Sequence, residues 1–303
     1  MQSINVISLA PDVTDWLAIS HHPRILNVFD HACNLINERG EVLSIVTQEI
    51  GNGPFNLVIE DDVLFSDHLD VQSRISNSPI QLNLGNLTIN TTSTKFWSPR
   101  PDWETLHTSK DNVLDQLMKL PITNYLRSGG FDTVCLEYTG LLNHQNLPIA
   151  QTPISNSLIS ALTNADLTSS LAAAQQLAGL GQGLTPAGDD FILGAVLAAW
   201  IIHPSYLANM LANEITKIAA PLTTSLSAAW LRSAGKGDAG ILWHNFFNAL
   251  ISADEITIQK SMKQLLAVGH TSGADALSGF IDMMMSCVKV PSKSIQIGNK
   301  IRP

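Results

Sequence analysis

The residues best suited to chemistry lie in a glycine-rich run that ends in two adjacent carboxylates. Residues 179–190 hold four glycines and finish with Asp189 and Asp190, where an apolar helix is expected to begin. A helix N-terminus offers unpaired N–H groups and a partial positive charge, and glycine lets the backbone approach an anion closely. The run therefore predicts a phosphate or carboxylate site. The residues expected to bind the anion are Gly181, Gly183, Thr185 and Gly188.

The two carboxylates conflict with a bound anion, because like charges repel. A divalent cation such as Mg²⁺, held by Asp190 and shared with the substrate, would resolve the conflict. The run lacks the lysine of the phosphate-binding P-loop and the spacing of the dinucleotide fingerprint, so it implies no organic cofactor. A structural alternative stays open, in which the glycines and one aspartate only form the entry and the cap of a core helix.

A second segment repeats this pattern. Gly-x-Asp, an aliphatic residue and a further glycine follow one another at 188–194 and again at 273–279. Each copy places a hydroxyl, a glycine and a carboxylate at the expected start of a helix. We expect Asp190 and Asp275 to face one ion or substrate, as catalytic carboxylates and as metal ligands. The second loop would bind the substrate through Thr271, Ser272 and Gly273. Chance recurrence of a common capping pattern is the alternative.

Four further residues could take part in the same site. His270 lies inside the second loop and is the candidate proton carrier. Arg232 and Lys236 are basic residues near these segments and could pair with an anion, while Thr224 adds a hydroxyl at another helix start. The structural alternatives are a hydrogen bond for His270, a buried ion pair for Arg232 and a solvated side chain for Lys236.

Composition excludes several partners and locations. The net charge is -9 and no stretch concentrates Lys and Arg, so nucleic acid and anionic membranes are poor partners. The longest apolar run, 191–202, is shorter than the about 20 residues that span a membrane. The N-terminus lacks a basic segment typical of a signal peptide, and the three cysteines form neither pairs nor metal-binding spacings. We therefore expect a cytoplasmic protein.

Hydrophobic patterning predicts an α+β fold with two domains that divide near residue 150. The β-rich domain, 1–150, is expected to hold one or two capping helices, and the α-helical domain, 151–303, to carry the Gly/Asp loops. Strands are predicted at 24–35, 42–46, 55–59 and 131–136 and in a hairpin over 79–92, with a helix at 109–125. Later helices are predicted at 155–177, 189–202, 204–219, 224–233, 240–252, 256–266 and 274–288.

Charge is scarce in the first part of the predicted helical domain. Only six charged residues fall within 151–235. Helices with so few charges are buried on most sides, because a solvated helix face is normally polar. We therefore expect either a thick bundle core or an interface with another chain, in an oligomer or a complex.

The same segments carry a resemblance to a known family. The runs 181–190, 224–231 and 269–275 resemble the bacterial family catalogued as DUF2877, and 31–35 and 53–57 are similar to it more loosely. The resemblance implies a subunit of an oxamate carbamoyltransferase in allantoin, hence purine, catabolism, which converts oxalurate and phosphate to oxamate and carbamoyl phosphate. It also implies an acyl-CoA-synthetase-like protein and a further subunit as partners.

Three functional hypotheses follow. The first is a subunit of a carbamoyl-transferring complex that handles a small carbamoyl or acyl phosphate and a carboxylate. The second is a noncatalytic structural or regulatory subunit that docks the synthetase-like partner, with the Gly/Asp loops as helix caps. The third is a stand-alone enzyme that uses an acyl phosphate or a nucleotide.

Overall fold

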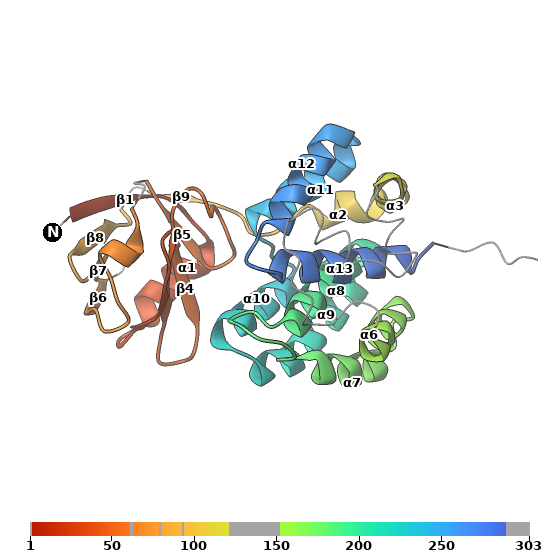
Figure 1. Cartoon of the computed structure of the whole chain (residues 1–303), viewed down its shortest axis with the longest axis horizontal. Coiled ribbons are helices and arrows are strands. Elements are labelled where there is room, and N and C mark those ends of the chain that lie inside the picture. The colour runs from red at the N-terminus through yellow and green to blue at the C-terminus, as the bar shows by residue number, and fades with distance from the viewer. Residues whose placement is uncertain (1, 61–62, 79, 93, 121–151, 289–303) are drawn as a thin grey trace, which may run out of the picture.

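The computed structural model describes residues 2–60, 63–78, 80–92, 94–120 and 152–288, which form two bodies (Figure 1). The sheet body holds the strands, and the helical body holds the helices from Trp103 onward. The strands are β1 (Gln2–Leu9), β2 (Arg24–Val28), β3 (Ala32–Ile36), β4 (Val42–Val46), β5 (Asn56–Ile59), β6 (Ile75–Ser78), β7 (Gln81–Leu84), β8 (Leu87–Asn90) and β9 (Lys95–Phe96). This is the α+β class that the sequence predicts.

Strand β1 joins the two halves of the sheet. The strand order is β2-β3-β4-β5-β1-β8-β7-β6, and β9 also pairs with β1. The first half of β1 runs parallel to β8, and its second half runs antiparallel to β5 and parallel to β9. The other pairs are antiparallel except for β4 and β5, which run parallel.

The sheet body forms because alternate strand residues share one apolar face. In the β7–β8 hairpin, Leu82 lies opposite Ile89 and Leu84 opposite Leu87, and all four are buried. This confirms the predicted hairpin, whose two-residue turn begins at Gly85 with a positive φ. Helix α1 (Pro11–Ile19) adds its buried residues to the same core, together with the short helix η1 (Phe65–Asp67).

Helix α8 lies at the centre of the helical body, where every residue from Gly188 to Ile201 is buried. Its neighbours in this chain therefore account for its lack of charge, without another chain. The helices of this body are α2 (Trp103–Thr108), α3 (Lys110–Lys119), α6 (Pro153–Thr163), α7 (Leu167–Leu177), α8 (Ala187–Ile202), α9 (Ser205–Ala219), η2 (Ala220–Leu222), α10 (Ser225–Lys236), α11 (Ile241–Ser252), α12 (Glu255–Leu266) and α13 (Ser272–Met285).

Several element boundaries differ from the sequence prediction. The strand expected at 24–35 is the hairpin of β2 and β3, which turns where Phe29 N–H bonds to Ala32 O at 2.8 Å. The helix expected at 155–177 is divided into α6 and α7, because Ala165 takes a left-handed φ and Asp166 caps α7. The strand predicted at 131–136 lies outside the described residues.

Helices α2 and α3 pack with the helical body, although we expected helices here to cap the β-rich domain (Figure 1). The reason is aromatic packing: the Trp103 ring stacks on Trp200 at 5.8 Å between centroids, and its Nε1 donates to Gly237 O at 2.7 Å. The domain division near residue 150 falls within 121–151, outside the described residues, and stays a prediction.

Helix α10 connects the two bodies. The Phe55 ring contacts the Trp230 ring edge-on with centroids 4.7 Å apart, and Lys236 Nζ bonds to Asp12 Oδ2 at 2.7 Å.

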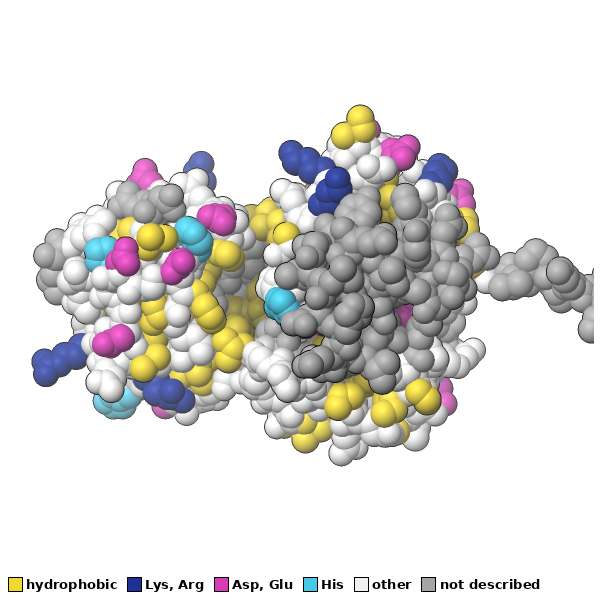
Figure 2. Space-filling view, in the orientation of Figure 1, with side chains coloured by type: hydrophobic (Ala, Val, Ile, Leu, Met, Phe, Trp, Pro, Cys, Tyr) yellow, Lys and Arg dark blue, Asp and Glu magenta, His cyan; other side chains and the backbone are white. Residues whose placement is uncertain are grey.

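The charged side chains visible in Figure 2 are scattered, without a basic patch on the described part of this face. Among the described residues, no helix has the length and apolarity needed to cross a membrane.

Helices α8 and α13 touch through their backbones. A Cβ added at Gly194 would lie 1.7 Å from Ala276 O, and one added at Gly279 would lie 2.1 Å from Phe191 O. The two contacts are reciprocal, because each glycine meets the carbonyl three residues before the other. Any side chain at either position would therefore force the two helices apart.

We expect Gly194→Ala and Gly279→Ala each to lower the free energy of unfolding by about 3 kcal/mol, the upper range for overpacking, because backbone atoms cannot move aside. Urea unfolding measures the loss. Gly40→Ala is the control, since its Cβ would meet nothing within 4 Å and only the positive φ opposes it. Equal, small losses in all three variants would contradict the close packing.

Candidate functional site

The repeated sequence pattern is also a structural repeat. A Cβ at Gly188 would lie 2.1 Å from Leu177 O, at the end of α7, and one at Gly273 would lie 1.8 Å from Leu265 O, near the end of α12. Gly188 thus lets α8 pack closely against α7, and Gly273 lets α13 pack closely against α12. Together with the reciprocal contacts of Gly194 and Gly279, they place the two helix starts in equivalent surroundings.

A hydroxyl–hydroxyl contact joins the two loops directly. Thr185 Oγ1 and Ser272 Oγ lie 2.7 Å apart, although they are far apart in the sequence. Both side chains are half-buried. The structure therefore brings together the two loops that the sequence pattern predicted to converge.

Asp189 anchors the first loop. Its side chain is 1% exposed, and its Oδ1 accepts a hydrogen bond from Gly179 N at 2.8 Å. Its Oδ2 accepts from the hydroxyls of Thr223 and Ser227, the latter at 2.7 Å. Asp189 thereby ties the glycine-rich loop to the start of α10, and it does not cap α8, which has no side-chain cap.

Thr224 strengthens the same junction. Its Oγ1 caps α10 by accepting from Ser227 N at 3.1 Å, and it donates to Leu184 O in the glycine-rich loop. Leu226 and Trp230, further along α10, pack against the sheet body. Helix α10 therefore positions the glycine-rich loop and also contacts the sheet body. Thr224 lies beside this loop, as predicted, but its hydroxyl bonds to backbone groups of the protein.

Asp190 is buried without full hydrogen bonding. It is 8% exposed, and its Oδ2 is buried with no hydrogen-bond partner. Burial raises the pKa of Asp190 well above its usual value, the Ser272 hydroxyl opposes that rise, and the charges of Asp275 and Asp189 add to it. A polar atom left in this state is costly, and such atoms recur at functional sites.

Asp275 occupies the equivalent position in α13. It lies in the first turn of that helix and is half-buried. Its charge acts on the pKa of Asp190, so the two carboxyl groups, the acid pair, are close enough to repel each other. The acid pair can accept N–H donors, hold a cation or share a proton.

The remaining predicted residues have different settings. Gly181, Gly183, His270 and Thr271 are exposed in the two loops, so they flank the acid pair from the solvent side. Arg232 is exposed on α10, and Lys236 pairs with Asp12 between the bodies. The structure therefore does not bring Lys236 to the loops. Its side chain is exposed, as the solvated alternative has it, and it forms a surface ion pair with Asp12.

Sequence reasoning missed the anchoring group formed by Asp189, Thr223 and Ser227. The available signal was the doubled aspartate, which we interpreted as a cap next to a ligand. The true partner of Asp189 lies across the fold at the start of α10, and no local pattern predicts such a contact. The hydroxyl-rich run at 223–227, which holds the partners of Asp189, was the other sequence feature that could have indicated this contact.

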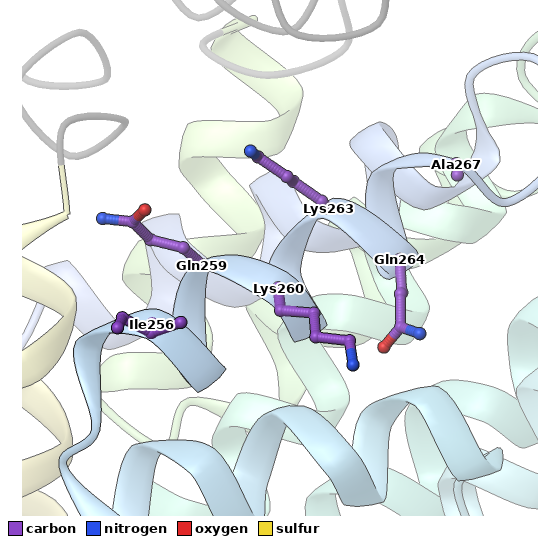
Figure 3. Close-up of a pocket in the computed structure, with 6 residues that line it drawn as sticks. All are labelled: Ile256, Gln259, Lys260, Lys263, Gln264 and Ala267. Carbon is purple, nitrogen blue, oxygen red and sulfur yellow. The ribbon is translucent and has the colours of Figure 1, made fainter.

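Other features of the described residues offer no competing centre. No three His, Cys, Asp or Glu side chains gather to hold a metal ion in this part of the chain. A surface hollow lined by Ile256, Lys260, Lys263 and three neighbours lies on the solvent side of α12, and neither Asp190 nor Asp275 lines it (Figure 3). Cys33 is free and buried, and burial raises its pKa to about 12, so its thiol is inert.

The fold and the site first indicate a general class of protein. This is a two-body α+β chain whose helical body pairs two equivalent helix starts around buried carboxylates. The site has no nucleotide-binding loop in its sequence.

Comparison with known protein families identifies the family of this chain. The family model described as oxamate carbamoyltransferase subunit AllH matches residues 177–284, and the AllH family N-terminal domain matches residues 5–98. These matches cover most of the chain, which therefore belongs to the AllH family. The first match spans both loops of the site. No solved structure matches the chain. A subunit of a carbamoyltransferase complex implies partner subunits.

We expect Asp189→Ala to lower the free energy of unfolding by about 2–3 kcal/mol, because buried donors of Gly179, Thr223 and Ser227 would lose their acceptor. Urea unfolding gives the value. The control is Asp166→Ala, which removes an exposed cap at the start of α7 and should have a clearly smaller effect. If the two variants lost equal stability, Asp189 would not be an anchor.

The free energy of unfolding should also fall as the pH rises, because Asp190 loses its proton. The folded chain binds this proton more tightly than the unfolded chain, so the contribution is complete below pH 3.8 and disappears as the pH rises to the elevated folded pKa. Asp190→Asn should remove this component and be the more stable protein at neutral pH. Urea unfolding across pH tests it. Asp282→Asn is the comparison, because its carboxyl pKa is raised to about 6 and it should remove a separate component between pH 3.8 and about 6. A constant difference between Asp190→Asn and wild type would contradict the prediction.

Proposed function

We propose that this chain contributes a substrate site to an oxamate carbamoyltransferase complex of purine-derived nitrogen catabolism. The reaction would convert oxalurate and phosphate to oxamate and carbamoyl phosphate. The observation that carries the proposal is the buried Oδ2 of Asp190, which lacks a partner beside two loops joined by Thr185 and Ser272. The match to the subunit family over the same segment supports it.

The proposed roles follow from burial. Asp190 and Asp275 would orient the substrate, and the hydroxyls of Thr185 and Ser272 would hydrogen-bond its carbonyl oxygen. His270 and Thr271, exposed at the edge of the loops, would contact the part of the substrate nearer to solvent, with His270 as proton carrier. The flanking glycines, Gly181, Gly183, Gly188 and Gly273, would let the backbone approach closely.

A Mg²⁺ ion is the proposed alternative for charge balance. Two carboxylates from the chain, with substrate oxygens and water, are a donor set that Mg²⁺ accepts. Asp190 and Asp275 would be its protein ligands. The ion would offset the repulsion between the acid pair and an anionic substrate.

A second function is supported by a separate observation. Leu180, Leu184, Leu222 and Val268 are exposed in the loops around the acid pair or beside them. Aliphatic side chains grouped on loops are typical of a docking surface. The chain would then act as a structural subunit that docks an acyl-CoA-synthetase-like partner and a further subunit.

Substitution in the assembled complex separates the two functions. We expect Asp190→Asn and Asp275→Asn to lower the rate of carbamoyl phosphate formation by about a hundredfold or more while the complex stays intact. Size-exclusion chromatography follows assembly, and Asp282→Asn is the matched control, a second half-buried carboxyl on α13. Full activity in both acid-pair variants would contradict the substrate site, and loss of assembly would favour the docking role.

A further inference from the structure

The acid pair is unsuited to direct contact with a phosphate. Ionised carboxyls repel a phosphate held against them, and the repulsion is stronger near a protein surface than in bulk water. The nearby charges that act most on Asp190 are those of Asp275 and Asp189, which are negative, and Lys236 is engaged by Asp12. The anionic end of a substrate is therefore the part that these carboxyls would reject.

Carboxyl oxygens do fit N–H donors. The Oδ2 of Asp190 is more than nine-tenths buried and has no partner, so a donor that reached it would relieve a cost already present in the free protein. A primary amide carries two N–H donors and one carbonyl acceptor in a single plane. The hydroxyls of Thr185 and Ser272, which can donate, lie beside the carboxyls and would serve that acceptor.

We propose that Asp190 and Asp275 bind the N–H groups of a carbamoyl or carboxamide end, with the anionic end of the molecule pointing away from them. This inference rests on the proposed substrate site, whose ligand class it narrows. Gly183 is exposed in the adjoining loop, so the anionic end would lie toward solvent. The repeat supports this arrangement, because two equivalent helix starts would supply one acceptor each to the two N–H groups.

Two pairs of nearly isosteric ligands test this directly. Carbamoyl phosphate and acetyl phosphate share a phosphate and differ by NH₂ against CH₃. Oxamate and oxalate share a carboxylate and differ by NH₂ against O⁻. Isothermal titration calorimetry on the wild-type chain, without and with Mg²⁺, should show the amide-bearing member of each pair bound at least tenfold more tightly, since a hydrogen bond to a charged group contributes about 1.5–3 kcal/mol.

Variants then assign the preference to the acid pair. Asp190→Leu, which removes the acceptor while filling the space, should bring each ratio close to one, and Asp275→Leu should lower it. Asp282→Asn should leave both ratios unchanged. If the leucine variants fail to fold, Asp190→Asn and Asp275→Asn take their place and should lower the ratios in part, because one oxygen acceptor remains.

Three outcomes would overturn the inference. Equal binding within each pair would show that the N–H groups are not recognised. Phosphate alone binding as tightly as carbamoyl phosphate would show that the anionic end is held. Tighter binding of oxalate than of oxamate, seen only with Mg²⁺, would show chelation by a metal instead. If the isolated chain binds nothing, the titrations are repeated on the assembled complex, and absence of the preference there also overturns it.

The result is separable from the proposed function. Preference for the amide ligands combined with full turnover by Asp190→Asn in the complex would leave the inference standing and remove the catalytic role. Loss of turnover in that variant without any preference would keep the substrate site and reject this orientation of the ligand.

Discussion

The close approach of α8 and α13 determines the geometry of everything around the acid pair. Packed helices usually keep 8–10 Å between their axes, and side chains at the contact set that distance. Here the backbones meet at Gly194 and Gly279, where no side chain fits. The same approach brings Asp275 within electrostatic reach of Asp190, although each carboxyl raises the energy of the other. The packing of a large apolar core therefore holds a polar arrangement that would not form by itself.

The two copies of the repeat have diverged in their support. In the first copy, Asp189 fixes the loop through Gly179, Thr223 and Ser227. The matching position in the second copy is Ala274, which has no such side chain. Asp190 thus follows an anchored loop, while Asp275 follows a loop with exposed residues. The two acids also differ in exposure, since Asp190 is buried and Asp275 is half-buried.

Local patterns in the sequence account for much of the fold. Period-two alternation located the β7–β8 hairpin, and helical spacing located α8 to within two residues of its start. The missed break between α6 and α7 has a physical reason, because neither glycine nor proline marks it and Ala165 takes the left-handed φ. Helix α1 and strand β1 were also missed, since the first twenty residues lack a strict period.

The site was predictable only in part, for a related reason. The repeat of glycine, aspartate and glycine indicated that Asp190 and Asp275 would face each other, because equivalent local sequences build equivalent helix starts. The partners of Asp189 and Lys236 depend on how α10 lies between the bodies, which no local pattern specifies. Sequence therefore pointed to both acids, whose shared ligand stays a prediction, while the anchor and the position of the basic residues required the fold.

The acidic character of the proposed site bears on how such a subunit would work. A substrate with an amide at one end and a negative charge at the other needs two different environments. In the proposed site, carboxyl and hydroxyl oxygens would supply the first, and Lys236 pairs with Asp12 instead of with the loops. A partner subunit or a metal ion would bring positive charge to the second. A chain that bound only one end of its substrate would be active only in combination, which agrees with a family described as a subunit.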